Sequence, residues 1–283
     1  MSQTRDRNPV MTSRKSDVPT LLLLAVMYAL LAGNAVLYYT APLHPLAHVA
    51  IGAIAIHLAF TIWHEAVHGT VSGNQRANDA VGVLGMLPYM TPFFLQRWLH
   101  LEHHRCLNQP DDPNREYTDG LYLTLPFRYP RALAHARRLL PSDPRTKAQR
   151  RSDTATTALV LGVLAVALAT GHGLDFLVLW FAPVVVAKLV MDWYINYLPH
   201  RGLDSDDLRG TRITAVGWLT PLVLNHNYHA VHHIWPTVPW HRYREIYRNK
   251  LDYLTRNGVP IESRITSSRP ESARPHGDSA RTR

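Results

Sequence analysis

Residues 45–68 read PLAHVAIGAIAIHLAFTIWHEAVH, an apolar run that leads directly into two histidines four residues apart. The run from Pro45 to Trp63 is long enough to cross the hydrocarbon of a bilayer, which takes about 17 to 25 helical residues. On a helix, His64 and His68 lie on one face about one turn apart, so both side chains can share one metal ion. The stretch therefore predicts a membrane span that ends in a metal-binding motif.

Three further runs have the length and apolar character of a span, namely Pro19 to Tyr39, Thr154 to Thr170 and Leu174 to Tyr194. A fifth run, Ala80 to Leu95, is shorter and contains two prolines, so a re-entrant or interfacial segment is expected there. Four spans place both chain ends on the same side of the membrane. The expected fold is an all-α integral membrane protein with four transmembrane helices, this extra segment, and a helical cytoplasmic cap.

The distribution of positive charge supports this topology independently. Of the 30 lysines and arginines, 29 fall outside the spans on the side predicted to be cytoplasmic, as expected for loops that stay inside. We divide the chain into a cytoplasmic tail (1–18), a membrane domain (19–262) and a disordered basic tail (263–283). The basic segments 107–153 and beyond 233 are expected to lie against anionic headgroups. The net charge is +9, but the basic residues do not follow the pattern of a nucleic-acid-binding module, so no nucleic-acid partner is expected.

Two more histidine clusters follow the pattern H-x-x-H-H. They are His100, His103, His104 after the proline-containing segment, and His229, His232, His233 beyond the last span. On a helix, neighbouring residues diverge by about 100°, so the adjacent histidines of each cluster can address different metal ions. With the first pair, eight clustered histidines gather at one membrane face. This exceeds what one tetrahedral ion uses, and two metals are predicted.

The last span carries a polar stripe that predicts a ninth ligand. Lys188, Asp192, Asn196 and His200 recur every four residues, and polar groups at membrane depth usually face the bundle interior or a functional site. His200 is the predicted ligand. Five further polar side chains are predicted to hydrogen-bond the ligand histidines, with exposure to solvent as the alternative: Asn196, Asp192, Asn227, Glu65 and Asp111. The other histidines that we weigh are expected to be surface or core residues: His44, His48, His57, His135, His172, His241 and His276.

Imidazole ligation suits zinc, copper, iron or nickel, so spacing alone leaves the metal open. The three clusters in this order resemble the membrane fatty-acid desaturase and hydroxylase superfamily, and the resemblance implies a di-iron centre with O2 as co-substrate. The strings WHEAVHGTV (63–71), NYLPHRG (196–202) and NYHAVHHIWPTVPWHRY (227–243) resemble its carotenoid ring-oxidising branch. The likeness is greatest to β-carotene hydroxylases of cyanobacterial type and next to β-carotene ketolases. QPDDP (109–113) also resembles that branch.

The resemblance implies hydroxylation of the β-ionone ring of a carotenoid, with ketolation, or desaturation or hydroxylation of an acyl lipid, as alternatives. The single cysteine, Cys106, cannot hold an iron-sulfur cluster, so electrons must come from an external donor such as ferredoxin and its reductase. The expected location is a prokaryotic plasma membrane, with the metal site on the cytoplasmic side. Trp63, Phe93, Phe94 and Trp98 are candidates for an apolar substrate lining, with ordinary packing as the alternative.

Two rival functions are weighed against this interpretation. The residues 64–68 also match H-E-x-x-H, the zinc-peptidase motif in which the glutamate is the general base, but that function leaves six clustered histidines unused. A metal transporter would also use many histidines. Its ligands would follow a path across the membrane, whereas these gather at one face.

Overall fold

A computed structural model describes residues 16–118, 120–215 and 217–262. The predicted helical architecture with four candidate spans is confirmed, since four helices are long and apolar enough to cross a membrane. They are α1 (Val18–Thr40), α2 (Pro45–Val67), α7 (Lys147–Ala169) and a continuous helix over 173–200. The last consists of α8 (Gly173–Phe176), η4 (Leu177–Phe181), α9 (Ala182–Met191), η5 (Asp192–Tyr197) and α10 (Leu198–His200).

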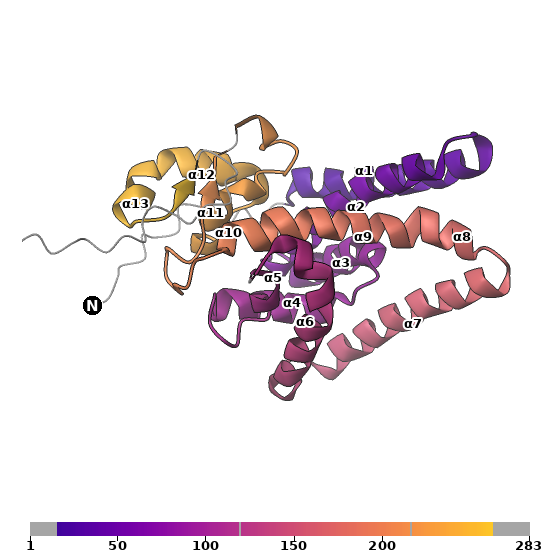
Figure 1. The fold of residues 1–283 in the computed structure, drawn as a ribbon, viewed down its shortest axis with the longest axis horizontal. Helices are drawn as coiled ribbons and strands as arrows, with labels where there is room; N and C mark the ends of the chain where they lie inside the picture. The colour runs from indigo at the N-terminus through magenta and orange to yellow at the C-terminus, as the bar shows by residue number, and fades with distance from the viewer. Residues whose placement is uncertain (1–15, 119, 216, 263–283) are drawn as a thin grey trace, which may run out of the picture.

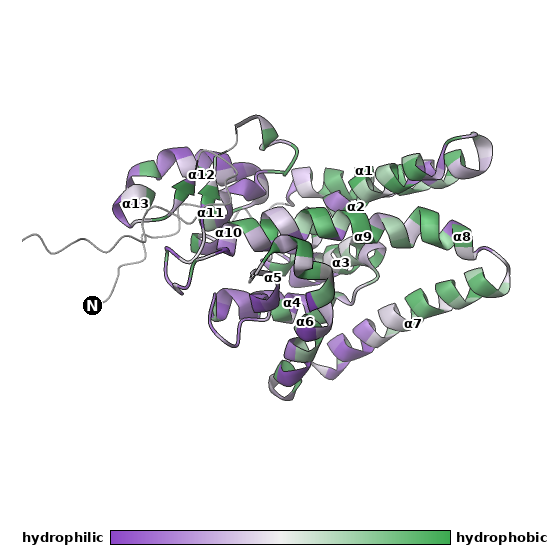
Figure 2. Cartoon of the chain, in the orientation of Figure 1, coloured by the Kyte–Doolittle hydropathy of each residue, from purple (hydrophilic) through white to green (hydrophobic). Residues whose placement is uncertain are grey.

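Helices α1, α2 and α9 lie side by side, whereas α7 diverges from them (Figure 1). A Cβ atom on Gly52 of α2 would lie 2.8 Å from a ring carbon of Pro183, so the small residue permits the close approach of α2 and α9. Between α1 and α2, the Asn34 amide bonds the His48 carbonyl oxygen (3.0 Å) and ring Nδ1 (2.9 Å). His48 is thus a satisfied core histidine. Apolar residues dominate the length of these helices (Figure 2).

The segment predicted to be re-entrant or interfacial forms part of a helical hairpin. Its first helix is α3 (Gln75–Met86), which is followed by η1 (Leu87–Tyr89) and α4 (Phe93–Arg105), the helix that carries the second histidine cluster. Gly82 and Gly85 let α3 pack tightly, because added Cβ atoms would lie 2.2 Å from the Phe93 ring and 2.9 Å from Ile62. Whether the hairpin enters the bilayer stays a prediction.

The start of α4 is fixed by a residue of α7. The Asp153 carboxylate accepts hydrogen bonds from the backbone N–H groups of Phe94 (3.0 Å) and Leu95 (2.9 Å). These are two of the N–H groups that a helix cannot satisfy internally, and a negative charge there is favourable. A membrane span therefore holds the histidine-bearing helix in place.

The remaining elements form a cap at one end of the bundle (Figure 1). The insert before α7 contains α5 (Arg115–Thr118), η2 (Tyr122–Thr124), α6 (Leu125–Leu139) and η3 (Leu140–Ser142). The part after α10 contains β1 (Ile213–Thr214), η6 (Gly217–Leu219), η7 (His226–Tyr228), α11 (His229–Ile234), η8 (Trp240–Arg242), α12 (Tyr243–Asn249), α13 (Leu251–Arg256) and β2 (Ile261–Glu262). β1 pairs in parallel with β2, with Ile213 opposite Ile261. The part after α10 has its own apolar core around Val231, Tyr243 and Leu254.

Two polar contacts fasten this second core to the beginning of α1. His241 bonds the Asp17 carboxylate (2.9 Å), and the indole N–H of Trp240 donates to the Thr20 hydroxyl (3.1 Å). The third histidine cluster is thus held between the membrane bundle and the cap core.

The last span continues to His200, as the polar stripe requires. Within it, the Lys188 ammonium lies 2.9 Å from the Asp192 carboxylate, which also accepts a hydrogen bond from Asn196 (2.9 Å). Residues 192–197 form a π-helical turn, a distortion that often occurs at functional sites. The stripe therefore leads along one helix into the histidine cluster.

Candidate metal centre

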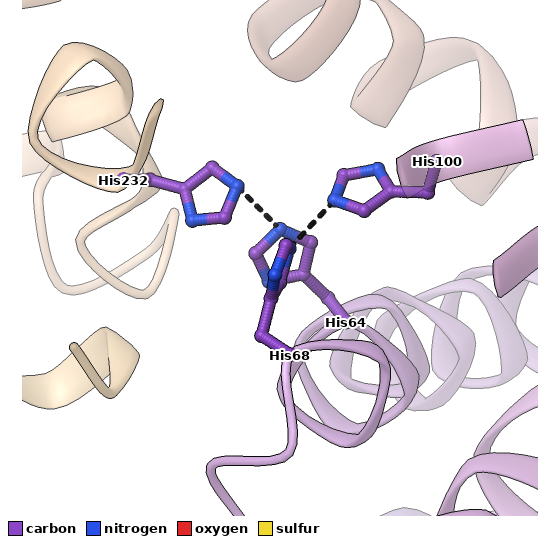
Figure 3. Close-up of side chains that lie close together, drawn as sticks. All are labelled: His64, His68, His100 and His232. Carbon is purple, nitrogen blue, oxygen red and sulfur yellow. Dashed lines mark hydrogen bonds between the residues drawn. The ribbon is translucent and has the colours of Figure 1, made fainter. Parts of the chain in front are cut away.

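All nine predicted ligands meet at the junction of the bundle and the cap. The first group of four, drawn in Figure 3, contains His64, His68, His100 and His232. The second contains His103, His200, His229 and His233. In each group the ligand nitrogens lie within 4.8 Å of one another, and His104 joins His232 and His233 in a third set that links the two.

The predicted divergence within each H-x-x-H-H cluster is present. On α4, His103 belongs to the second group, whereas the Nε2 atom of His104 lies near the first, 3.1 Å from His100 and 2.9 Å from His232. On α11, His232 belongs to the first group and His233 to the second. Each helix thus contributes side chains to both groups.

The histidines of both groups turn Nε2 inward. The Nε2–Nε2 separations are 3.1 Å for His64 and His232, and 2.9 Å for His68 and His100. A metal–imidazole bond is about 2.1 Å long, so ring nitrogens at these separations can share one metal ion.

The second group has the same spacing, with Nε2 of His229 lying 2.9 Å from that of His200 and 3.0 Å from that of His233. Burial lowers the pKa of several ligands outside the spans, since it penalises the charged imidazole, and it brings that of His68 to about 3. The others are His100, His104, His229, His232 and His233, where neighbouring histidines lower the pKa further. Neutral imidazole is the form that binds metals, so the donor set fits two cations.

A buried carboxylate orients the second group from behind. The carboxylate of Asp112 lies 2.8 Å from Nδ1 of His103 and also accepts backbone N–H bonds from Asn108 and Asn114, each at 2.8 Å. Such a contact fixes the tautomer, so that Nε2 faces the metal. Asp111, the predicted supporting residue, is exposed in this irregular turn, and its neighbour Asp112 makes the contact instead.

A tyrosine performs the corresponding role in the first group. The Tyr243 hydroxyl lies 3.1 Å from Nδ1 of His232, and the buried Glu65 carboxylate lies near the same hydroxyl. Burial, and then the negative charge of Glu65, raise the pKa of Tyr243, so the phenol keeps its proton. Glu65 additionally accepts a hydrogen bond from Thr70 (2.6 Å). Tyr243 is thus a supporting residue of His232 that the sequence did not indicate. Glu65 lies beside it, which fits the predicted outer role of Glu65 better than that of a peptidase base.

The remaining predicted supporting residues act elsewhere. Asp192 and Asn196 bond each other, and Asn196 also accepts a hydrogen bond from Asn114 (3.2 Å), so these side chains bind one another and not the ligands. The amide of Asn227 donates to the Thr214 carbonyl (2.9 Å) and the Thr220 hydroxyl (3.2 Å). It stabilises the loop before the third cluster.

His226 is a buried histidine that the sequence reasoning did not weigh. Its Nε2 lies 2.9 Å from the Thr61 hydroxyl, and its ring packs edge-on against His64, with centroids 5.4 Å apart. It therefore packs beside the first group without joining it. Of the histidines predicted not to be ligands, His57 lies against the Leu222 carbonyl (2.9 Å), and His276 lies outside the described residues.

A cavity of about 280 Å³ opens against both groups. His64, His100, His103 and His229 form part of its wall, and most of the rest is apolar, from Phe60, Trp63, Met86, Tyr89, Leu99, Met191 and Ile195. Lys188, Asp192 and Asn196 also line it. Of the aromatic residues predicted as lining, Trp63 lies in the wall, whereas Phe93, Phe94 and Trp98 are buried in packing outside it.

Several known proteins are similar to this chain in sequence. The fatty acid desaturase family model matches residues 39–264. A β-carotene ketolase of Paracoccus sp. strain PC1 is 30% identical over 199 residues, which cover 65% of this chain and 71% of the relative. A second, from Paracoccus sp. strain N81106, is 28% identical over 225 residues, covering 74% and 83%. An sn-1 oleoyl-lipid 12-desaturase of Picosynechococcus sp. is 38% identical over 65 residues, covering 22% and 19%. With four candidate spans and a match over most of its length, the chain belongs to the fatty acid desaturase family.

Proposed function

We propose that this membrane oxidoreductase holds two irons and uses O2 to oxidise the β-ionone ring of a carotenoid. The observation that carries the proposal is the cavity, in which histidines of both metal groups meet a mostly apolar wall. Two bound irons would activate O2 with two externally supplied electrons, which is chemistry that side chains lack. The balance is R–H + O2 + two electrons + two protons, giving R–OH + water.

The protein's own residues orient the ligand histidines and keep water out of the cavity. Asp112 and Tyr243 contact Nδ1 of two ligand histidines and so orient the rings with Nε2 inward. Phe60, Met191 and Ile195 exclude water and accept an apolar substrate. The cavity volume lies near the lower end of the range of about 300–1,000 Å³ for small-molecule sites, so it suits one end of a long lipid rather than a whole carotenoid.

A hydroxylated carotenoid is the first product that we propose, and a keto-carotenoid is the second. A second hydroxylation of the same CH2 carbon gives a geminal diol, which loses water to form a ketone. Both carotenoid relatives are ketolases, which supports two rounds of oxidation at one carbon. The sequence strings favour the hydroxylase, so the two candidates differ in the number of turnovers on one ring.

The test is expression of the chain in a bacterium that accumulates β-carotene, with a ferredoxin and its reductase, followed by analysis of pigments and fatty acids together. Hydroxylated or keto-carotenoid supports the proposal and identifies the product. The matched control is His233→Ala, which removes a ligand of the second group and should abolish product at equal protein level. Unchanged pigment with new double bonds or hydroxyls in acyl chains would refute the carotenoid substrate.

We also propose on which side of the membrane the metal site lies and where its electrons come from. The charge distribution supports a cytoplasmic metal site in a prokaryotic plasma membrane, with both chain ends on that side. An external donor such as ferredoxin delivers the electrons there. Labelling of a cysteine introduced at Arg256 in intact cells, with impermeant and permeant reagents, tests this orientation; reaction with the impermeant reagent would contradict it.

A further inference from the structure

Helix α6 exposes a stripe of apolar residues on its outer face. Phe127, Pro130 and Ala134 run along the middle of this face, and Phe127 is 82% exposed. Leu133 at its edge is 54% exposed, and Leu123 just before the helix is 85% exposed. Side chains of this size and exposure, gathered on one short segment, indicate contact with another apolar phase.

Arginines border the apolar stripe. By helical position, Arg131 and Arg138 lie along one edge, whereas Arg137 lies between Pro130 and Leu133 on the other side, and all three are exposed. An apolar stripe edged with arginines is typical of a helix that lies in the membrane interface, where guanidinium groups meet lipid phosphates. α6 also runs across the direction of α9 rather than along it, as an interfacial helix should (Figure 1).

The opposite face of α6 belongs to the cavity wall. Ala132 and Ala136, one turn apart, line the cavity beneath the helix. Between them and the N-terminus of α6, the Tyr129 hydroxyl donates to the Asp192 carboxylate of the last span (2.9 Å). The buried Arg128 holds α6 to its own insert by bonding the Leu121 carbonyl oxygen (3.3 Å). One helix thus has the cavity on one side and the apolar outer face on the other.

We propose that α6 lies in the headgroup–acyl boundary of the bilayer and forms the lipid-facing wall of the cavity. The occupant of its outer face is lipid, and its arginines favour an anionic leaflet. A substrate dissolved in the bilayer then reaches the cavity past α6 without crossing water. The membrane position of α6 is independent of the proposed function, and only its effect on turnover rests on that function.

The position is tested with nitroxide labels on the full chain in vesicles of phosphatidylcholine and phosphatidylglycerol. Phe127→Cys and Ala134→Cys report the outer face, and Arg256→Cys on α13 is the aqueous control. The native Cys106 is buried, so the unmodified chain gives the background. We expect the labels at 127 and 134 to lie about 5–10 Å below the phosphates and to collide with oxygen more than with a water-soluble nickel complex. Collision rates like those at 256 would overturn the proposal.

The wall is tested by the same substitution on the two faces of α6. Ala132→Phe should fill the cavity and lower carotenoid turnover about tenfold, since overpacking a cavity of fixed shape is costly. Ala134→Phe should change turnover by less than about twofold, as for other surface substitutions. Both variants should keep the iron content of the unmodified chain. Equal loss in the two variants would overturn the wall; an unmodified chain without carotenoid product would refute the proposed function and leave the label depths to stand.

Discussion

The substitution Tyr243→Phe removes one oxygen atom between Glu65 and His232, and its effect follows from the contacts of that atom. The hydroxyl lies 3.1 Å from Nδ1 of His232, and the Glu65 carboxylate lies near it. Glu65 keeps the 2.6 Å hydrogen bond from Thr70, so most of the loss falls on His232. That ring then lacks the partner that holds its Nδ1 atom and orients it.

Loss of such an outer contact lowers metal affinity by about 10–100-fold, which corresponds to about 1.4–2.8 kcal/mol. Because His232 belongs to the first group, the proposed iron held there should dissociate first. Iron per chain should fall from two toward one at a chelator concentration that leaves the unmodified chain fully loaded. The assay is metal analysis of detergent-purified full-length protein after dialysis against graded chelator, with the absorption spectrum recorded in parallel.

Tyr247→Phe is the matched control, because Tyr247 lies one turn further along α12 and its ring packs on Tyr228, with centroids 5.0 Å apart. It should retain both irons. The positioning role of Tyr243 is refuted if Tyr243→Phe keeps the chelator midpoint of the unmodified chain. A fall in thermal stability that is equal in both variants, with iron retained, would assign the hydroxyl a merely structural role.

Three further outcomes are expected. Asp112→Asn should weaken iron binding in the second group about 10–100-fold, whereas Asp111→Asn should leave iron binding unchanged in the same chelator series. Gly82→Ala should lower stability by about 1–3 kcal/mol, because the new Cβ would lie 2.2 Å from the Phe93 ring; Gly162→Ala on α7, which meets nothing within 4 Å, should not, and thermal melting compares them. Chelation of bound metal should lower the melting temperature of the full chain, because the inward Nε2 lone pairs then repel one another; an unchanged melting temperature would contradict the metal centre.

The features that could be predicted from sequence are those that depend on local spacing. Apolar length alone indicates the four candidate spans, and helical periodicity places His64 and His68 on one face. The stripe ending at His200 could be predicted because residues four apart stay near one face of a helix, even where the helix contains a π turn. The two-group arrangement follows because neighbouring side chains on a helix diverge by about 100°.

The features that escaped prediction depend on how distant segments pack. Asp111 and Asp112 are adjacent in an irregular turn, where no periodicity tells which one faces His103. Tyr243 lies ten residues beyond the last cluster, and only the folding of α12 onto α11 brings it to His232. The α3–α4 hairpin was likewise hidden, because its two prolines suggested a single broken segment.

The third histidine cluster supplies ligands to both metal groups, with His232 in the first and His229 and His233 in the second. Neither set of four is complete until this part of the chain has been synthesised and has docked between the spans and the cap. Loading of the two proposed metals would therefore be a late, joint event in the maturation of the protein. A chain truncated before residue 229 should emerge as a membrane protein that lacks both complete sites, rather than as one that holds a single metal.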